Sequence, residues 1–220
     1  NFNKERRYGW FPSISGGWVP TQYDWYRNLL PFNNFLKFRA SWGRVGNDRL
    51  KDENGNDIRF PYLTTLGNVS STWGTGLAEN RTGSMNLKWE VSTKTNFGID
   101  ARFFDDKVDM TVDFFHTKTT DIFQRRANIP DEGGLSNVLP YANIGSMKSW
   151  GMDGTLAYTH TFNKDMSLTV RGNFTHAENE VIYWEQSGVN YPYQSNSGVP
   201  YKVQRGLIAL GLFKDEDDIK

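Results

Sequence analysis

Two adjacent segments of the chain alternate apolar and polar residues so regularly that they limit the fold more than any other feature. The alternation runs through residues 94–104, pauses at Asp105 and Asp106, and resumes through residues 107–118. Successive side chains of a β-strand point to opposite faces, so the pattern predicts a hairpin with one apolar face and one charged face. The apolar set is Phe97, Ile99, Ala101, Phe103, Val108, Met110, Val112 and Phe114. Either a second sheet of a soluble protein or lipid must cover this face.

Four further segments repeat the pattern, at residues 8–18, 36–43, 152–162 and 166–176. Most of the six predicted strands are about ten residues long. A strand in a soluble protein usually has about five or six residues, whereas a tilted strand that crosses a bilayer needs about 9–11. The strand lengths therefore favour an all-β fold whose antiparallel strands cross a membrane.

The connections between the predicted strands alternate in length. Tight polar turns fall at residues 105–106 and 163–165, whereas long segments rich in Gly, Asn, Ser and Asp occupy residues 45–90, 119–150 and those after about 185. Short turns at one rim and long loops at the other are typical of a bacterial outer-membrane barrel. Alternation alone is equally compatible with a soluble β-sandwich, whose inner faces show the same pattern.

Composition excludes several classes of protein. The 25 basic and 25 acidic residues balance, so nothing indicates a nucleic-acid partner, which requires a basic excess or stripe. The chain has no cysteine, which excludes disulfides and thiolate metal sites. Its longest apolar run, residues 206–213, is far shorter than the roughly 20 residues of a membrane-spanning helix.

No catalytic, metal or cofactor site is predicted. The three histidines have no second ligand at metal-binding spacing on the same face. They are His116, His160 and His176. Acidic residues fall on the predicted polar faces, where the wall of a water-filled lumen explains them better than acid–base catalysis does. They are Asp100, Asp109, Asp113 and Asp153. The acidic run 215–218 lacks the ligand spacing of a calcium loop, and no nucleotide-binding or hydrolase motif is present.

Aromatic residues form two sets that differ in their predicted location. One set lies near strand ends on the apolar faces, where outer-membrane barrels place their interface girdles. It comprises Trp18, Trp42, Tyr158 and Phe162. The other set is predicted to lie in loops, where aromatic rings can stack on sugar rings or contact a partner protein. It comprises Trp73, Trp150, Trp184, Tyr191, Tyr193 and Tyr201.

Several stretches, taken in order, resemble one known family. FPSISGGW (11–18) and FLKFRASWGRVGN (35–47) are similar to consecutive barrel strands of SusC/RagA-like TonB-dependent outer-membrane transporters. The segment 86–123, which begins NLKWE and continues through NFGIDARFF, resembles the next two strands of that family. NIGSMKSWGMDGTLAY (143–158) resembles a later strand, and GLFKDEDDI (211–219) resembles an element of a long extracellular loop.

The resemblance implies a fold and a function for the parent protein. Residues 1–185 would supply six strands and connecting loops of a large transmembrane β-barrel, and residues 186–220 would be part of a long extracellular loop. The family's plug domain, TonB-contacting segment and remaining strands have no counterpart here, so the resemblance implies a fragment.

The expected role is active import of glycans, oligosaccharides or peptides across the outer membrane, together with a SusD-like surface lipoprotein. Energy would come through TonB, and neither a cofactor nor enzymatic activity is expected. Two alternatives remain open: a passive outer-membrane pore or adhesin barrel, and a secreted carbohydrate-binding β-sandwich.

Overall fold

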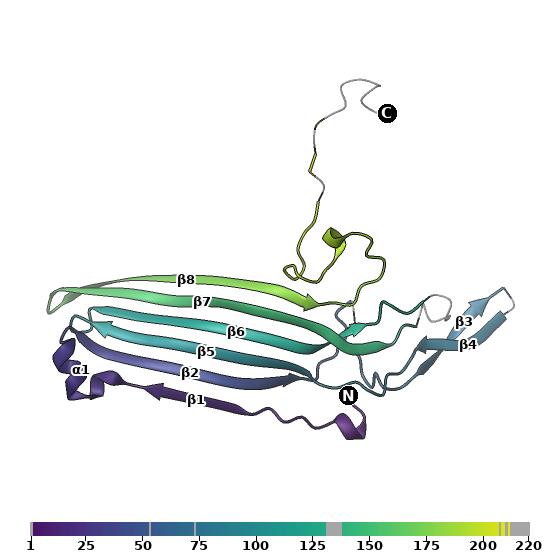
Figure 1. The fold of residues 1–220 in the computed structure, drawn as a ribbon, viewed down its shortest axis with the longest axis horizontal. Coiled ribbons are helices and arrows are strands. Elements are labelled where there is room, and N and C mark those ends of the chain that lie inside the picture. The colour runs from purple at the N-terminus through teal and green to yellow at the C-terminus, as the bar shows by residue number, and fades with distance from the viewer. Residues whose placement is uncertain are drawn as a thin grey trace.

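The computed structural model describes residues 2–52, 54–72, 74–130, 138–206, 208–209 and 211. Its main body is one elongated antiparallel sheet (Figure 1). The strands are β1 (Ser13–Trp18), β2 (Asn33–Asn47), β3 (Thr65–Ser71), β4 (Gly74–Arg81), β5 (Glu90–Phe103), β6 (Val108–Arg125), β7 (Tyr141–Asn163) and β8 (Met166–Tyr183). The helical elements are the 3-10 turns η1 (Lys4–Arg6), η2 (Pro20–Gln22) and η4 (Pro192–Gln194) and the short helix α1 (Asp24–Leu29).

The sheet has up-and-down topology. Its strand order is β1-β2-β5-β6-β7-β8, so each strand lies beside the next one in sequence once the separate β3–β4 hairpin is set aside. All five pairings are antiparallel. The sheet is open, with β1 and β8 at its edges (Figure 1). The six antiparallel strands predicted from the sequence are confirmed.

The short connections lie at one end of the sheet, and the long ones lie at the other (Figure 1). In the β5–β6 turn, Phe104, Asp105 and Asp106 all have φ between 57° and 61°. Asp tolerates this left-handed conformation better than most residues, which explains two acidic residues in so tight a turn. The Asp105 N–H donates to Asn34 Oδ1 at 2.9 Å, so the first residues of β2 brace the turn.

Two predicted loops are shorter or more structured than the sequence indicated. β6 continues to Arg125 and β7 begins at Tyr141, so most of the predicted loop 119–150 is strand. Register shifts between Thr119 and Phe123 interrupt the pairing of β6 with β7. The regular alternation of apolar and polar residues stops there, although both strands continue. The predicted loop position of Trp150 is therefore wrong: this residue lies inside β7, opposite His116.

The predicted loop 45–90 contains the hairpin β3–β4, which sequence reasoning missed. The hairpin extends beyond the loop end of the sheet (Figure 1). Its strands are rich in Gly, Asn, Ser and Thr, residues that ordinarily indicate irregular loops. The Arg81 guanidinium donates to the carbonyls of Arg59 and Phe60 and so anchors the base of the hairpin.

The buried core of the chain lies under the long loops. It is built from Phe2, Leu50, Ile58, Leu87 and Phe123, with Trp89 and Tyr141 packed against it. The rings of Phe123 and Tyr141 stack at 4.6 Å, which joins β6 to the start of β7. Buried apolar packing therefore orders the loop end, whereas the apolar side chains of the sheet are largely exposed.

The apolar face of the sheet has no covering layer within the part of the chain that the structure describes. A β-sandwich requires a second sheet packed across this face. The only other sheet among the described residues is the β3–β4 hairpin, which extends away from the loop end (Figure 1). The structure therefore contradicts the β-sandwich alternative.

Candidate functional site

The outward face of the sheet is a continuous apolar surface. Strand pairing places Phe38, Ile99 and Val112 in one row and Phe97, Phe114 and Met152 in the next. Large apolar side chains on this face are strongly exposed, among them Leu156 at 52%, Val170 at 60% and Ile14 at 72%. From Met152 to Phe162 on β7 and in the rows paired with that segment, all of them described, no Asp, Glu, Lys or Arg occupies this face; Glu178 on β8, opposite Trp150, is the first charged residue toward the loop end.

The height of this apolar surface matches a bilayer. Between Trp150 and Phe162, β7 advances roughly 40 Å at about 3.3 Å per residue. At a strand tilt of about 40°, that length corresponds to roughly 30 Å along the membrane normal, which is the hydrocarbon thickness. The exposed apolar face is thus the right size to be covered by lipid.

The short turns show how the strands tilt. The β5–β6 turn begins directly after the row that contains Phe103, Val108 and Tyr158, whereas β7 continues beyond Tyr158 to Asn163 before it turns. Because the turns of a membrane barrel share one rim, this stagger gives the direction of tilt. Trp18 therefore belongs to the short-turn rim with Tyr158 and Phe162, although its partner Phe38 lies well inside β2.

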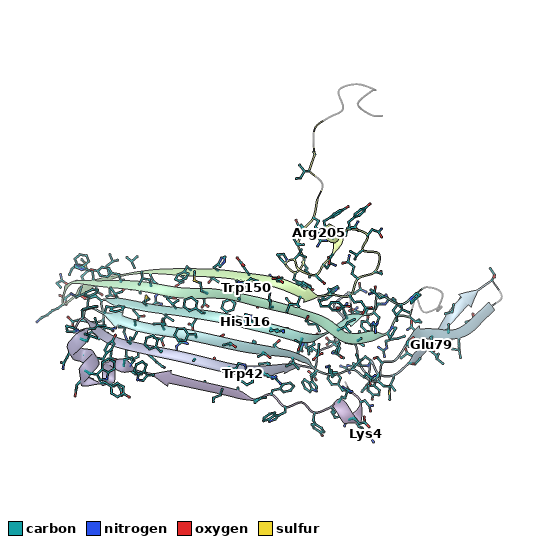
Figure 2. The ribbon with its side chains drawn as sticks, in the orientation of Figure 1. Lys4, Trp42, Glu79, His116, Trp150 and Arg205 are labelled. Atoms are coloured by element: carbon teal, nitrogen blue, oxygen red, sulfur yellow. The ribbon has the colours of Figure 1, made fainter. Side chains whose placement is uncertain are left out.

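The structure places all four predicted interface aromatics on the outward face, and it adds Trp150 to them. Trp18, Tyr158 and Phe162 lie toward the short turns, and they are 47–55% exposed. Trp42 lies toward the long loops, in one row with His116 and Trp150 (Figure 2). The loop-end side of the face thus has two Trp residues, of which sequence reasoning recognised one in this role.

The opposite face of the sheet is polar and internally paired. Arg39 Nε lies 2.8 Å from Asp100 Oδ2, and Arg39 Nη2 lies 3.0 Å from Asp113 Oδ2. Strand pairing puts Gly98 between Arg39 and Asp113, and a Cβ atom on Gly98 would approach both side chains to 2.5–2.7 Å. Glycine is therefore what allows Arg39 to reach from β2 across β5 to β6.

Farther along the polar face, side chains hydrogen-bond across the strands, as Thr155 Oγ1 does with Asn173 Oδ1 at 3.0 Å. Asp100, Asp109, Asp113 and Asp153 all occupy this face, as the sequence predicted. The two carboxylates bound to Arg39 are 23–27% exposed. This arrangement is that of a hydrated wall.

A cavity of 830 Å³ opens among the segments at the loop end of the sheet. Its lining comes from the loop-side ends of β6, β7 and β8, from the chain adjoining those ends, and from residues 51, 52 and 55 after β2. It includes Gln124, Arg126, Tyr141, Trp184, Glu185 and Tyr201. The rings of Trp184 and Tyr201 lie 6.0 Å apart, so two of the predicted contact residues share this cavity.

Glu185 organises one wall of the cavity. Its side chain is only 4% exposed, and its carboxylate accepts hydrogen bonds from the backbone N–H groups of Ala127 at 3.1 Å and Asn128 at 2.8 Å. Arg126 Nε forms an ion pair with it at 2.9 Å. Burial by itself raises the pKa of Glu185, but these hydrogen bonds outweigh that effect and hold the pKa below its ordinary value. The carboxylate thus fixes the chain that follows β6 against the end of β8.

Sequence reasoning missed Glu185, Arg126 and Gln124, and no local pattern indicates them, because two segments far apart in the sequence, the end of β6 and the end of β8, bring them together. The other predicted contact residues lie elsewhere. Tyr191 and Tyr193 stack on each other at 5.5 Å and are exposed on the segment after β8. Trp73 lies outside the described residues.

The described ranges contain neither a membrane-spanning helix nor a metal-binding cluster. No helix there is long and apolar enough to cross a membrane. No cluster of three or more His, Asp or Glu side chains in that part of the chain could hold a metal ion.

An apolar outward face, a polar inner face, short turns at one rim and long loops at the other define a segment of a transmembrane β-barrel wall. Residues 1–206 match the model of the family described as "TonB dependent receptor-like, beta-barrel". The chain belongs to this family.

Individual relatives agree with this membership. The chain is 33% identical over 181 residues to TonB-dependent receptor P39 of Formosa agariphila, covering 82% of this chain and 16% of that protein. It is 27% identical over 185 residues to TonB-dependent receptor SusC of Bacteroides thetaiotaomicron, covering 82% of this chain and 18% of that protein. The chain therefore spans less than a fifth of the length of these relatives.

A solved structure shows the same architecture. The RagAB peptide importer in its "closed-closed" state matches with a TM-score of 0.67 and 26% identity. The match covers 86% of this chain and 20% of that one. The predicted family and the fold class of a transmembrane barrel segment are thus both confirmed.

Proposed function

We propose that this chain is part of the barrel wall of an active importer that carries large nutrients across the bacterial outer membrane. The family consists of outer-membrane receptors, and the relatives include a protein named SusC and a peptide importer. The proposed cargo is an oligosaccharide, with a peptide as the second possibility. The proposed partners are a SusD-like surface lipoprotein at the long-loop end and TonB, which acts through a part of the receptor outside this chain.

The observation that carries the proposal is the aromatic cavity at the loop end. Trp184 and Tyr201 present two rings at an angle of 49°, and aromatic faces bind the apolar faces of sugar rings while neighbouring polar groups bind hydroxyls. Gln124 also contributes to the lining, and its side-chain Nε2 donates to the Glu185 carbonyl at 3.2 Å, which joins two sides of the cavity. The cavity therefore offers stacking surfaces beside polar side chains, such as that of Arg126, to an incoming ligand.

The cavity is tested by uptake in cells that express the complete receptor. We expect the double variant Trp184→Ala/Tyr201→Ala to lower the rate of oligosaccharide uptake at least fivefold, because stacking on each ring contributes on the order of 1 kcal/mol. Tyr191→Ala/Tyr193→Ala is the matched control, since that ring pair lies outside the cavity. Normal uptake by the first variant, or an equal loss in both, would remove the cavity from the transport route.

Energy dependence tests the class of transporter. Deleting TonB from the same cells should abolish uptake if the barrel is an active importer. Uptake that persists without TonB would instead identify a passive pore, the alternative that the barrel fold leaves open.

A further inference from the structure

A row of long basic side chains crosses the outward face just beyond Trp42 and Trp150. Strand pairing aligns Arg44 with Thr93, Thr93 with Lys118, and Lys118 with Lys148. Arg44 lies two residues after Trp42 on β2, and Lys148 lies two residues before Trp150 on β7. Residues two apart on a strand point to the same face, so the row belongs to the outward face and not to the lumen. Arg44, Lys118 and Lys148 are called here the outward basic row.

The charges of this row are only partly compensated by the protein. Lys118 and Lys148 lie directly opposite each other on β6 and β7, an arrangement in which like charges repel. Glu180 on β8 pairs with Lys148 at 2.9 Å. Among the described residues, no carboxylate lies within ion-pair distance of Arg44 or Lys118, and both side chains are exposed. Two positive charges of the row therefore lack a counter-ion within the described part of the chain, at the edge of the apolar part of this face.

Two basic residues of the row contact the Trp residues beneath them. The Arg44 guanidinium lies 5.9 Å from the centre of the Trp42 ring, and Lys148 Nζ lies 5.3 Å from the centre of the Trp150 ring. Such cation–π contacts hold the cations at the edge of the apolar band, with the aliphatic stems lying on apolar surface. The charged groups are thus placed at the boundary between hydrocarbon and headgroups.

The depth of the row agrees with this boundary. Two residues along a strand correspond to about 7 Å, or roughly 5 Å of height at a tilt of about 40°. The headgroup layer on each side of a bilayer is about 5–8 Å thick. Because the strands tilt, the row descends by roughly 3 Å per strand from Lys148 toward Arg44. Lys118 and Lys148 therefore lie in the headgroup layer at the long-loop end, and Arg44 lies just below it, from where its long side chain reaches the headgroups.

The described rows at the other rim contain no such line of basic residues. Near the short turns, the corresponding row on the outward face contains Phe103, Val108, Tyr158 and Val170, none of which is charged. The basic residues near the short turns, Lys107 and Lys164, lie in the β5–β6 and β7–β8 turns and do not form a paired row across the outward face.

We propose that the outward basic row binds phosphate groups of lipid headgroups in the leaflet at the long-loop end. Phosphate oxygens accept charge-assisted hydrogen bonds from guanidinium and ammonium groups. Thr93, between Arg44 and Lys118, is short enough for both long side chains to converge above it. The lipid supplies the negative charge that relieves the Lys118–Lys148 repulsion. This site lies outside the barrel and does not depend on which nutrient the receptor carries.

The test uses the complete receptor that contains this chain, purified in detergent and titrated with diphosphorylated lipid A under native mass spectrometry. We expect Arg44→Ala/Lys118→Ala to weaken binding at least fivefold. Lys94→Ala is the matched control, because Lys94 lies in the neighbouring row of β5 but on the lumenal face. The same titration with lipid A stripped of its phosphates should give weak binding to every variant.

Three results would overturn the proposal: unchanged binding to Arg44→Ala/Lys118→Ala, an equal loss in Lys94→Ala, or equally tight binding of the dephosphorylated lipid to the unaltered receptor. The last result would mean that acyl chains alone hold the lipid. Heat-modifiable mobility in electrophoresis checks that each variant folds. If the double variant does not fold, Arg44→Gln and Lys118→Gln keep the side-chain length, and each should weaken binding two- to threefold.

Discussion

The two faces of β2, β5 and β6 belong to the same strands but are built on opposite principles. On the outward face, Phe97 and Phe114 are 42% and 44% exposed and have only other apolar side chains beside them in their row. On the lumenal face, Arg39 binds Asp100 and Asp113, and Gly98 makes room for that contact. Between the Met152 row and the short turns the described rows of the outward face contain no charged residue, whereas the lumenal face accumulates charge and compensates it by pairing across strands.

This difference shows which interactions each face requires. Lipid offers no hydrogen-bond partner, so a charged side chain on the outward face would remain uncompensated. Water in the lumen screens charges, so partly exposed ion pairs there contribute little to stability, about 0–1 kcal/mol each. A substitution should therefore have a much larger effect when it places charge outward than when it disturbs a lumenal pair.

The largest effect is expected from a charge in the centre of the outward face. Val112→Arg should destabilise the complete receptor in lipid vesicles by roughly 2–4 kcal/mol, the cost of Arg at the bilayer midplane. The measurement is urea-induced unfolding from the vesicles. Thr111→Arg is the matched control, because Thr111 precedes Val112 and faces Asp100 on the lumenal side. Equal destabilisation by both substitutions would show that the faces have been assigned wrongly.

A smaller effect is expected from closing the space at Gly98. Gly98→Ala places a methyl group where Arg39 and Asp113 meet, so the ion pair must separate. We expect a loss of about 1 kcal/mol or less in the same unfolding experiment, since the pair is partly hydrated. In the background of Arg39→Ala, where the pair no longer exists, Gly98→Ala should cost measurably less. Full additivity of the two substitutions would contradict the role assigned to Gly98.

The sheet could be predicted from the sequence because residues along each strand alternate between apolar side chains that face lipid and polar side chains that face water. The alternation of Phe97 to Phe103 with polar residues identifies both a strand and its lipid-facing side. The tight turn at Asp105 and Asp106 follows from residues that tolerate left-handed backbone. These features depend only on neighbours in the chain, so reading them requires no knowledge of the tertiary structure.

The loop end could not be predicted in the same way. Trp150 was misplaced because β7 extends past the region of regular alternation, and the pairing that puts it beside His116 is a property of the sheet. The contact between Glu185 and Arg126 joins residues far apart in sequence, and nothing near either residue indicates the other. The hairpin β3–β4 escaped notice because its Gly- and Asn-rich strands lack an apolar face.

The smallest effect is expected from acid at Glu185. Because its pKa is lowered in the folded protein, the ionised carboxylate stabilises the loop end at pH values above its ordinary pKa of 4.5. This stabilisation is lost as the pH falls from 4.5 through the lower folded-state value. Hydrogen exchange, corrected for the intrinsic pH dependence, should show the amides of Ala127 and Asn128 losing protection in that range, because both donate to this carboxylate. The central amides of β6 should remain protected.

Glu185→Gln separates the ionisation of Glu185 from general acid unfolding. The amide side chain cannot form the ion pair with Arg126, so protection of Ala127 and Asn128 should be reduced at neutral pH and change little on acidification. If the variant loses protection over the same acid range as the unaltered receptor, another group controls the transition. In that case the carboxylate is only a packing element of the cavity wall, and the loop end depends on its apolar core instead.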